Sequence, residues 1–387
     1  ITGMYYDGRW NASDQVARRA IREGTVGRFG RLSDDEGADT ARGSLQFNRQ
    51  WTDGNATTQL SAYAGYYDLD LFSNFTYFLD NPERGDQFEQ QDQRWFSGLK
   101  ASRTWDYKIS GRNVSSTLGF DTRHDWMDGI GLYKTETRNR FETVRQDDVY
   151  EASAALFTEH NVQMLDKLRL TAGVRADLFR FDVESDQPEN TNDDWDGIVS
   201  PKLGLVLGPW AETELYLNGG LGFHSNDARG VTIAIDPNTG EKTNPVDPLV
   251  QIRGAEIGLR SQAVTDLTTT LGLWIQESDS ELVYVGDAGA TEASRPSKRQ
   301  KASSVLAELE VGVQRGPGHG SDGCRPRPAA GQVHRGQQLQ HAGPPGRAVA
   351  RAVDLEHFVD LRADAQHRVQ RRHRLLKDHR DAVAAQV

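Results

Sequence analysis

A histidine and two aspartates, His124, Asp125 and Asp128, lie close enough in the sequence to share a metal ion. Imidazole nitrogens and carboxylate oxygens are ordinary metal ligands, but this spacing matches no standard metal site. Such residues are also typical of the start of a solvated loop, which we expect here. The sequence contains no phosphate-binding loop, dinucleotide fingerprint or nucleophile elbow. It therefore predicts neither an enzyme nor a bound cofactor or metal.

Residues 182–197 carry seven acidic side chains and no basic one: Asp182, Glu184, Asp186, Glu189, Asp193, Asp194 and Asp196. Such a segment could attract cationic ligands or bind calcium through carboxylate oxygens. The spacing is not that of an EF-hand loop. We therefore expect a solvated loop.

Residues 69–79 concentrate large apolar side chains: Leu69, Leu71, Phe72, Phe75, Tyr77, Phe78 and Leu79. Exposed apolar surface costs about 25 cal/mol per Å², so these side chains are expected to cover something. One interpretation is that the segment continues a strand and packs on its neighbours. The other is that some of its rings stack on a small ligand while Asn74 supplies hydrogen bonds. The rings in question are those of Phe72, Phe75, Tyr77 and Phe78.

A later polar segment offers charges and further hydrogen-bonding groups. Its members are His224, Asn226, Asp227 and Arg229. We expect these four residues to join the aromatic segment in one ligand-binding region, if the strands between them bring the two segments to the same end of a sheet.

The elements that must position these residues are strands, because the first 300 residues alternate apolar and polar side chains with period two. From Leu168 to Leu178, for example, the even positions are apolar and most odd positions are polar. This predicts about eleven antiparallel strands, with a twelfth truncated near 296–300. The predicted strands lie near residues 1–10, 41–51, 57–68, 93–104, 114–123, 149–162, 168–178, 199–207, 215–223, 251–260 and 267–275.

The predicted connections alternate in length. Short ones fall at 52–56, 105–113, 163–167, 208–213 and 261–266, and long ones at 11–40, 69–92, 124–148, 182–197, 225–250 and 277–295. A soluble sandwich has no reason to collect its long loops at one end, whereas an outer-membrane barrel has short periplasmic turns and long external loops. Trp51, Trp105 and Trp210 lie at or beside short turns, where an interfacial aromatic belt would fall.

Composition changes sharply near residue 300. Residues 1–300 carry 31 Lys+Arg against 47 Asp+Glu, whereas residues 301–387 carry 14 against 9 and contain no Trp or Tyr. A basic tail of this kind could contact nucleic acid, but it offers no aromatic residue for stacking and no motif, so we expect no nucleic-acid partner. A disordered linker is a second interpretation. We favour a reading-frame shift near Gln300 in a GC-rich gene.

Several phrases in residues 1–300 resemble the barrel of TonB-dependent outer-membrane receptors. They are Tyr67–Asp80, Gly85–Gln90, Leu170–Arg175, Ser200–Gly204, Gly222–Gly230 and Val283–Gly289. The resemblance implies an all-β antiparallel transmembrane barrel. The family barrel has 22 strands closed by an N-terminal plug. This chain shows no plug-like segment or TonB box and about half the strands, so we expect an incomplete barrel with open edges.

What the resemblance implies about function concerns the full-length parent receptor. That receptor would reside in the outer membrane of a Gram-negative bacterium and import a siderophore, metal complex or other small nutrient. Its partners would be the TonB–ExbB–ExbD complex, reached through the plug, and the surrounding outer-membrane lipid and lipopolysaccharide. Two alternatives remain open: a passive porin-like channel or barrel enzyme, and a secreted β-sandwich adhesin.

Overall fold

The computed structural model describes residues 1–13, 16–265, 267–280 and 302–313. Their strands are β1 (Thr2–Asn11), β2 (Gly37–Asp53), β3 (Ala56–Ser73), β4 (Phe88–Ile109), β5 (Arg112–Glu136), β6 (Asn139–Leu165), β7 (Leu168–Ser185), β8 (Asn192–Trp210), β9 (Thr213–Ser225), β10 (Leu249–Val264), β11 (Leu267–Ser278) and β12 (Ala302–Val313). The helical pieces are α1 (Arg18–Arg22), the 3₁₀ turn η1 (Pro188–Asn190) and α2 (Ala228–Val231). No helix in these ranges is long and apolar enough to cross a membrane.

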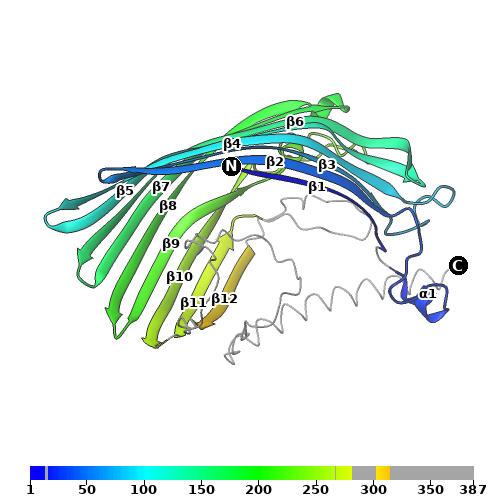
Figure 1. Ribbon diagram of the computed structural model, residues 1–387. Helices are drawn as coiled ribbons and strands as arrows, with labels where there is room; N and C mark the ends of the chain where they lie inside the picture. The colour runs from blue at the N-terminus through cyan, green and yellow to red at the C-terminus, as the bar shows by residue number, and fades with distance from the viewer. Residues whose placement is uncertain (14–15, 266, 281–301, 314–387) are drawn as a thin grey trace. The chain divides into compact units, whose positions relative to one another are not determined.

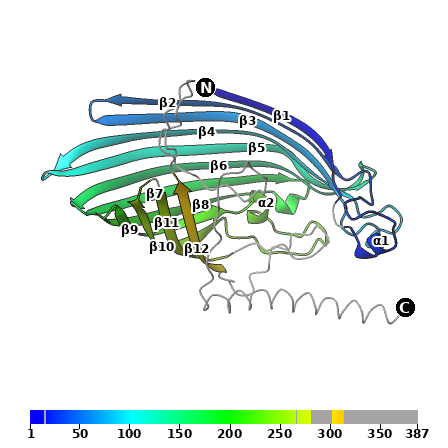
Figure 2. The ribbon, with the colours of Figure 1, turned by 60° about the horizontal axis from the view of Figure 1, so that its bottom comes forward.

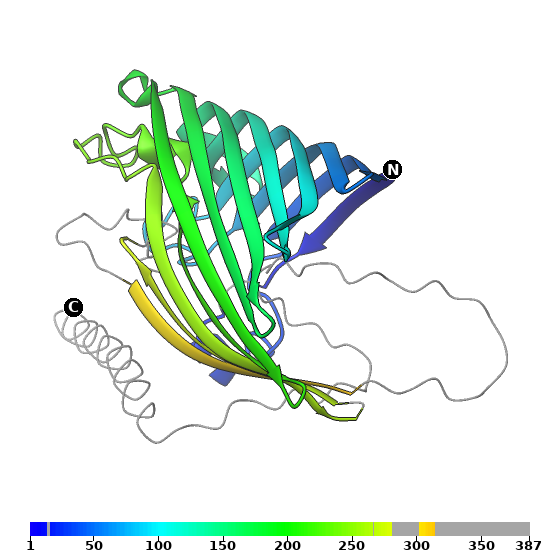
Figure 3. The ribbon, with the colours of Figure 1, turned by 90° about the vertical axis from the view of Figure 1, so that its left-hand side faces the viewer.

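The strands form an antiparallel sheet in which neighbours in sequence are neighbours in space, in the order β1 to β12. Within the described residues the sheet does not close on itself, as predicted. The chain divides into two compact units. The first comprises residues 1–210, 214–258 and 274–306, and Figure 3 shows its strands β1–β8 side by side in one curved layer. In the second unit, the Gln262 amide donates to the Glu212 carbonyl and the Thr213 and Ser261 hydroxyls are 2.8 Å apart.

The two ends of the strands differ, as the alternation of loop lengths predicts. Hairpins β2–β3, β4–β5 and β6–β7 turn in two residues each at one end, and α1 lies beyond the opposite end in the β1–β2 connection (Figures 1 and 2). The predicted long loop at 124–148 is wrong. β5 and β6 continue through it as one long hairpin that turns at Thr137 and Arg138, both in the left-handed region. The acidic segment 182–197 is likewise mostly strand, with only residues 186–191 between β7 and β8.

Strand register separates an apolar face from a polar face. Leu156 lies opposite Ala176, and Leu178 lies opposite Gly197, whereas Arg175 on the other face lies opposite Ser200. Leu156 is 62% exposed, which is unusual for the centre of a strand in water but ordinary for a surface that faces lipid. The apolar sets predicted from β7 and β8 therefore share one face, as expected.

Two residues lie on the face that does not match their polarity. The polar ring of His160 lies opposite Ala172 on the apolar face, where Ser116 binds its ring nitrogen at 2.8 Å. The apolar ring of Phe223 packs edge-on against Phe179, 5.7 Å away, on the polar face. Period two alone misplaces such residues near strand ends, where local contacts decide which way a side chain points.

Aromatic side chains mark two levels on the apolar face. At one level, directly opposed pairs run across the sheet from Tyr66 to Trp95 to Trp126 to Tyr150. At the other, near the short turns, lies Trp105. Trp95 and Trp105 are ten residues apart on β4, about 33 Å along an extended strand. At the usual tilt of about 45° this spans roughly 23 Å, close to the height of the apolar band of an outer-membrane barrel.

On the polar face, aromatic rings lie flat over glycines of the neighbouring strand. A Cβ atom at Gly119 would overlap the ring of Phe157, and one at Gly65 would overlap the ring of Phe96. Each ring thereby covers backbone that would otherwise be open and packs the inside of the sheet without adding bulk.

Candidate functional site

The segment between β9 and β10 folds back onto the polar face of the sheet instead of extending away from it. Its residues Ala228 and Val231 are buried with side chains from four strands, β5, β6, β7 and β10. The buried apolar cluster is made of Met127, Ile130, Val149, Phe181, Val183, Ala228, Val231 and Leu249. Burial of this apolar surface holds the 226–248 segment in place, which brings its polar residues close to the strands.

Asp227 is the N-cap residue of the short helix α2. The Asp227 carboxylate accepts a hydrogen bond from the Arg229 amide at 2.9 Å and binds the Arg229 guanidinium through both oxygens, at 2.9 and 2.7 Å. The Ala228 amide donates to Glu151 Oε1 on β6 at 2.9 Å. The Glu151 side chain therefore anchors the first turn of the helix to β6.

The Asp227–Arg229 pair sets the charge state of this segment. The surrounding protein would raise the pKa of Asp227, but the ion pair with Arg229 outweighs this effect and leaves the pKa below its usual value. The same pair raises the pKa of Arg229 against the opposing effect of burial. Both groups are charged at neutral pH, so the segment presents a fixed dipole to the space inside the strands.

A fully buried amide, Asn190 of η1, joins the β7–β8 connection to the 226–248 segment. Its Oδ1 accepts hydrogen bonds from the amides of Ala234 and Ile235 at 2.9 and 3.0 Å, and its Nδ2 donates to the Ile235 carbonyl at 3.2 Å. Gln187 adds a bond from its side chain to the Pro237 carbonyl. These bonds hold the two connections together as one unit.

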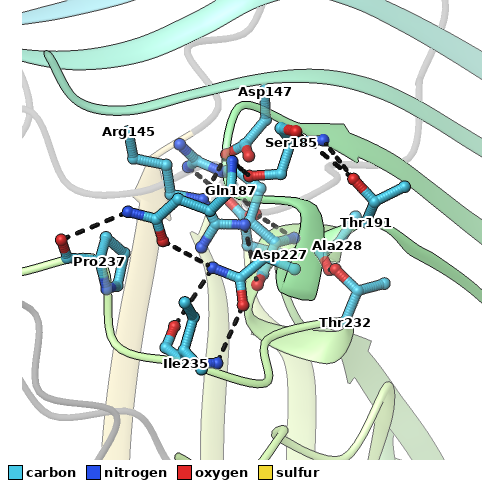
Figure 4. Close-up of polar contacts among 12 residues, drawn as sticks. Arg145, Asp147, Ser185, Gln187, Thr191, Asp227, Ala228, Thr232, Ile235 and Pro237 are labelled. Carbon is cyan, nitrogen blue, oxygen red and sulfur yellow. Dashed lines mark hydrogen bonds and ion pairs between the residues drawn. The ribbon is translucent and has the colours of Figure 1, made fainter. Parts of the chain in front are cut away.

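A buried ion pair on β6 supports the other side of the same unit. Arg145 and Asp147 pair within hydrogen-bonding distance, and the Arg145 guanidinium also reaches the Arg229 carbonyl at 3.5 Å (Figure 4). Asp147 is fully buried. Since an isolated buried carboxylate is costly, the pair is expected to be retained as a unit.

Two rings of the aromatic segment pack against neighbouring elements. Phe72 is buried, with the Arg138 guanidinium 4.8 Å from its ring, and Phe75 packs edge-on against Phe88 at 5.5 Å. Asn74 is buried and accepts a hydrogen bond from the Tyr77 amide at 2.8 Å. Of the four rings of the segment, only that of Phe78 is largely open, with 61% of the residue's surface exposed. The packing interpretation therefore accounts for Phe72 and Phe75, and Phe78 is left available to a ligand.

Asp86 closes the 74–87 loop. Its carboxylate accepts hydrogen bonds from the amides of Leu79, Asp80 and Asn81 at 2.7–3.2 Å. Partial burial would raise the pKa of Asp86, but the Thr76 side chain and these amides outweigh burial and lower the pKa. The loop is thus organised around a charged carboxylate.

The β5–β6 hairpin contacts both candidate segments. At its tip, the Arg138 amide donates to Gln87 Oε1 at 2.8 Å and its guanidinium donates to the Asp35 carbonyl at 2.7 Å. Nearer the sheet, Arg140 binds both oxygens of buried Glu89 at 2.6 Å. With Arg145 at the 226–248 segment, the hairpin connects the two predicted groups of ligand-binding residues.

The polar face below these loops alternates acids and bases on single strands. Arg123 pairs with Asp125, and Arg175 pairs with Asp177, each two residues along the same strand. A hollow of about 420 Å³ lies on this face; its lining includes Lys100, Phe157, Arg175, Ser200, Lys202 and Phe223. Because its charges are paired, the wall could contact a polar protein segment or solvent without a large net field.

Sequence reasoning found the loops but missed the residues that hold them. Asn226 is buried, and its side chain donates to the Asp247 carbonyl at 2.7 Å, while His224 is half-buried at the end of β9. Glu151, Asn190 and the Arg145–Asp147 pair were not predicted. Glu151 alternates regularly with its strand neighbours, and Asn190 lies in an acidic connection, so neither carries a distinguishing local signal.

His124 and Asp125, which the sequence places side by side, lie on opposite faces of β5. The His124 ring contacts the rings of Trp126 and Tyr150 on the apolar face, whereas Asp125 binds Arg123 on the polar face. Within the described ranges, no group of three or more His, Cys, Asp or Glu side chains is arranged to hold a metal ion.

An antiparallel sheet with an exposed apolar face, aromatic levels and loops collected at one end defines a segment of a membrane-spanning β-barrel. The chain belongs to the TonB dependent receptor-like, beta-barrel family, whose model matches residues 2–309. It is accordingly an outer-membrane protein of the Gram-negative type. The apolar face is the lipid-facing side, and the polar face lines the barrel interior.

Solved structures of similar fold include the ferric citrate transporter FecA in its unliganded form, with 14% identity and a TM-score of 0.60 over 79% of this chain and 43% of that one. The pyoverdine outer membrane receptor FpvA from Pseudomonas aeruginosa PAO1 has 14% identity and a TM-score of 0.51 over 73% of this chain and 43% of that one. The ferric-catecholate import receptor Fiu from E. coli K12 has 11% identity and a TM-score of 0.51 over 74% of this chain and 46% of that one. The chain thus spans less than half the length of each. No curated protein sequence matches it.

Proposed function

We propose that the full-length receptor to which this barrel segment belongs imports a siderophore, a metal complex or another small nutrient across the outer membrane in a TonB-dependent way. Family membership supports uptake through a barrel, and the segment 226–248 supports a ligand-facing interior. The observation that carries the proposal is that this loop is anchored inside the strands by Glu151 and Asn190. A loop held there narrows the interior, which suits a selective receptor better than an open channel.

Ligand contact is proposed for the nine residues predicted from the sequence, with different roles. Phe78 offers an open aromatic face, and the Asp227–Arg229 pair offers charges to the interior. Phe72, Asn74, Phe75, Tyr77 and Asn226 would act mainly by shaping the loops that carry those groups, and His224 lies at the base of the second loop.

The partners proposed for the parent receptor are the TonB–ExbB–ExbD complex, reached through a plug, and a small-molecule ligand. Ferric citrate and the iron chelate of pyoverdine are reasonable first probes, because one structure of similar fold is described as a ferric citrate transporter and another as a pyoverdine receptor. Uptake of ⁵⁵Fe supplied as each chelate should be measured in cells that carry the full gene, with and without TonB. Uptake that persists without TonB would favour a passive channel and contradict the proposal, whereas no uptake of any metal chelate would exclude siderophores and metal complexes as the imported nutrient.

We further propose that the chain after the barrel segment derives from a shifted reading frame. The predicted start of this tail, residue 301, lies before the end of the family match at residue 309 and before the end of β12 at Val313. The change of frame would therefore fall at about residues 309–313. Residues 314–387 lie outside the described residues. Sequencing the gene would test this proposal: an alternative frame beyond codon 300 that encodes no alternating strands would contradict it.

A further inference from the structure

A second hollow, of about 420 Å³, lies on the interior face of the sheet beside the short turns, at the periplasmic end of the strands. Its lining comes from four neighbouring strands, β4 to β7. Trp105 marks the lipid-facing side of β4, so residues at odd separations from it face the interior. We call this space the turn-side hollow. Its interior-facing residues include Asp106, Lys108, Asn113, Asn161, Gln163 and Arg169.

The floor of the turn-side hollow is made of amides that already have partners. The side-chain nitrogen of Asn161 donates to Glu159 Oε1 at 3.0 Å, and its oxygen accepts from the Thr171 hydroxyl. The side-chain nitrogen of Gln163 donates to the Leu165 carbonyl at 2.7 Å. These bonds fix the shape of the floor and leave the charged side chains at its two sides to decide what binds.

Those two charged side chains are cations without a protein partner. Lys108 and Arg169 are exposed, and neither side chain makes an ion pair or hydrogen bond with any residue that the structure describes. Higher on the same face, by contrast, Arg175 pairs with Asp177. Of the described residues that line the hollow, Asp106 is the one acid. Two unpaired cations therefore share a concave surface, although residues 1–300 carry 47 acidic and 31 basic side chains.

The spacing of the two cations selects the kind of anion that would satisfy both. Lys108 lies opposite Asn113 on β5, and Arg169 lies opposite Gln163 on β6, so the cations come from the outer two of the four strands. Three strand spacings separate their backbones by about 14 Å. Long side chains that reach inward from both sides can bind two separate acidic groups of one small molecule, and the guanidinium suits a carboxylate in particular.

We propose that the turn-side hollow binds a small polycarboxylate chelate as the chelate leaves the barrel interior for the periplasm, with one carboxylate on Lys108 and another on Arg169. The proposal rests on the proposed uptake function and names the chemical class of its nutrient. The hollow lies at the end of the strands opposite to the long loops, so it would act after the ligand has been captured from outside.

The test is isothermal titration calorimetry of the complete 387-residue chain in detergent micelles, with citrate as the probe and its uncharged trimethyl ester as the comparison. We expect the chain to bind citrate in preference to the ester. Lys108→Gln combined with Arg169→Gln should weaken citrate binding about tenfold, because two charge-assisted contacts are lost.

Arg103 and Arg112 provide a matched control on the same part of the sheet. The Arg103 guanidinium lies 5.8 Å from the Trp105 ring centre, and Arg112 lies opposite Ile109, so both belong to the lipid-facing side near the short turns. Arg103→Gln combined with Arg112→Gln removes the same total charge and should leave citrate binding unchanged. An equal loss in both double variants would show a general effect of charge and overturn the proposal.

Asp106→Asn tests the hollow in the opposite direction. Removing the one carboxylate of the lining should tighten citrate binding about threefold, a gain that misfolding cannot imitate. The proposal is also overturned if the Lys108/Arg169 double variant binds citrate as the wild type does, or if the wild type does not prefer citrate to its ester. Absent citrate binding together with TonB-dependent ⁵⁵Fe uptake by the full-length receptor would overturn the hollow and leave the proposed function standing.

Discussion

At the scale of single residues, one buried amide fastens the interior loop. Asn190→Ala would leave the amides of Ala234 and Ile235 without their acceptor, at about 1–3 kcal/mol for each buried group. We therefore expect the free energy of local detachment of the 226–248 segment to fall by about 2–4 kcal/mol, while the strands remain folded. Limited proteolysis should therefore cleave the folded Asn190→Ala variant within residues 232–248 much faster than it cleaves the wild type. Asn238 is an exposed asparagine in the same segment, so the Asn238→Ala variant should be cleaved at the wild-type rate. Equal cleavage rates for the two variants would contradict this role of Asn190.

Asp86 gives the external loop a dependence on pH. Its pKa in the folded chain is lowered, below the value of about 3.9 in an unfolded chain. Its contribution to loop stability is therefore complete above pH 4 to 5 and is lost as the pH falls through the lowered folded value. Amide hydrogen exchange of Leu79, Asp80 and Asn81, corrected for intrinsic rates, should show this loss of protection in acid.

Asp86→Asn should remove most of that pH dependence and speed exchange of the same amides about tenfold, because a charged acceptor becomes neutral. Glu83→Gln changes an exposed carboxylate in the same loop and should have no such effect. Retained protection in Asp86→Asn would show that the loop is held by its apolar contacts instead.

At the scale of elements, alternation predicted the strands better than their lengths. Short-period patterns identify β5 and β6 where one face is apolar, but the two strands continue beyond that band, where shifts in the strand register break the alternation. Their turn lacks the usual Asn-Gly or Gly signal, although its residues Thr137 and Arg138 adopt positive φ values of 48° and 64°. Arg138 is fixed there by Gln87, Asp35 and Phe72. These contacts are distant in sequence, so no local pattern could have revealed them.

The candidate site was predictable to the same extent. The aromatic and polar segments could be located from composition, since large rings in a predicted connection need an explanation. Which of those rings would be covered could not be predicted. Phe75 is covered by Phe88 and Phe72 by Arg138, and both partners come from other elements.

Strand pairing predicts a specific cost at a glycine. In Gly119→Ala, the new methyl group would overlap the Phe157 ring on the neighbouring strand, so the ring must move and destabilise the β5–β6 pair. We expect a loss of about 1–3 kcal/mol in urea unfolding followed by Trp fluorescence in lipid vesicles. A Cβ atom at Gly222 meets nothing within 4 Å, so Gly222→Ala should be nearly neutral. A neutral Gly119→Ala would contradict the ring-over-glycine packing.

At the scale of the whole molecule, two assignments have to agree: which face meets lipid, and at what depth. Register fixes the first, because every directly opposed pair from β3 to β8 shares a face. The aromatic levels at Trp95 and Trp105 fix the second. Together they place Leu156 near the middle of the apolar band and Ser153, three residues away, on the interior face.

These assignments predict opposite outcomes for the same substitution. Leu156→Arg would place a charge near the bilayer midplane and should cost about 2–4 kcal/mol of folding free energy. Ser153→Arg would place the same side chain in the polar interior beside Glu151, two residues along on the same face, and should cost well under half as much. Urea titrations in lipid vesicles would measure both free energies. In detergent with a more hydrated interior the cost of Leu156→Arg should shrink, because part of it arises from the hydrocarbon itself. Equal costs in vesicles, or a larger cost at Ser153, would mean that the two faces have been assigned the wrong way round.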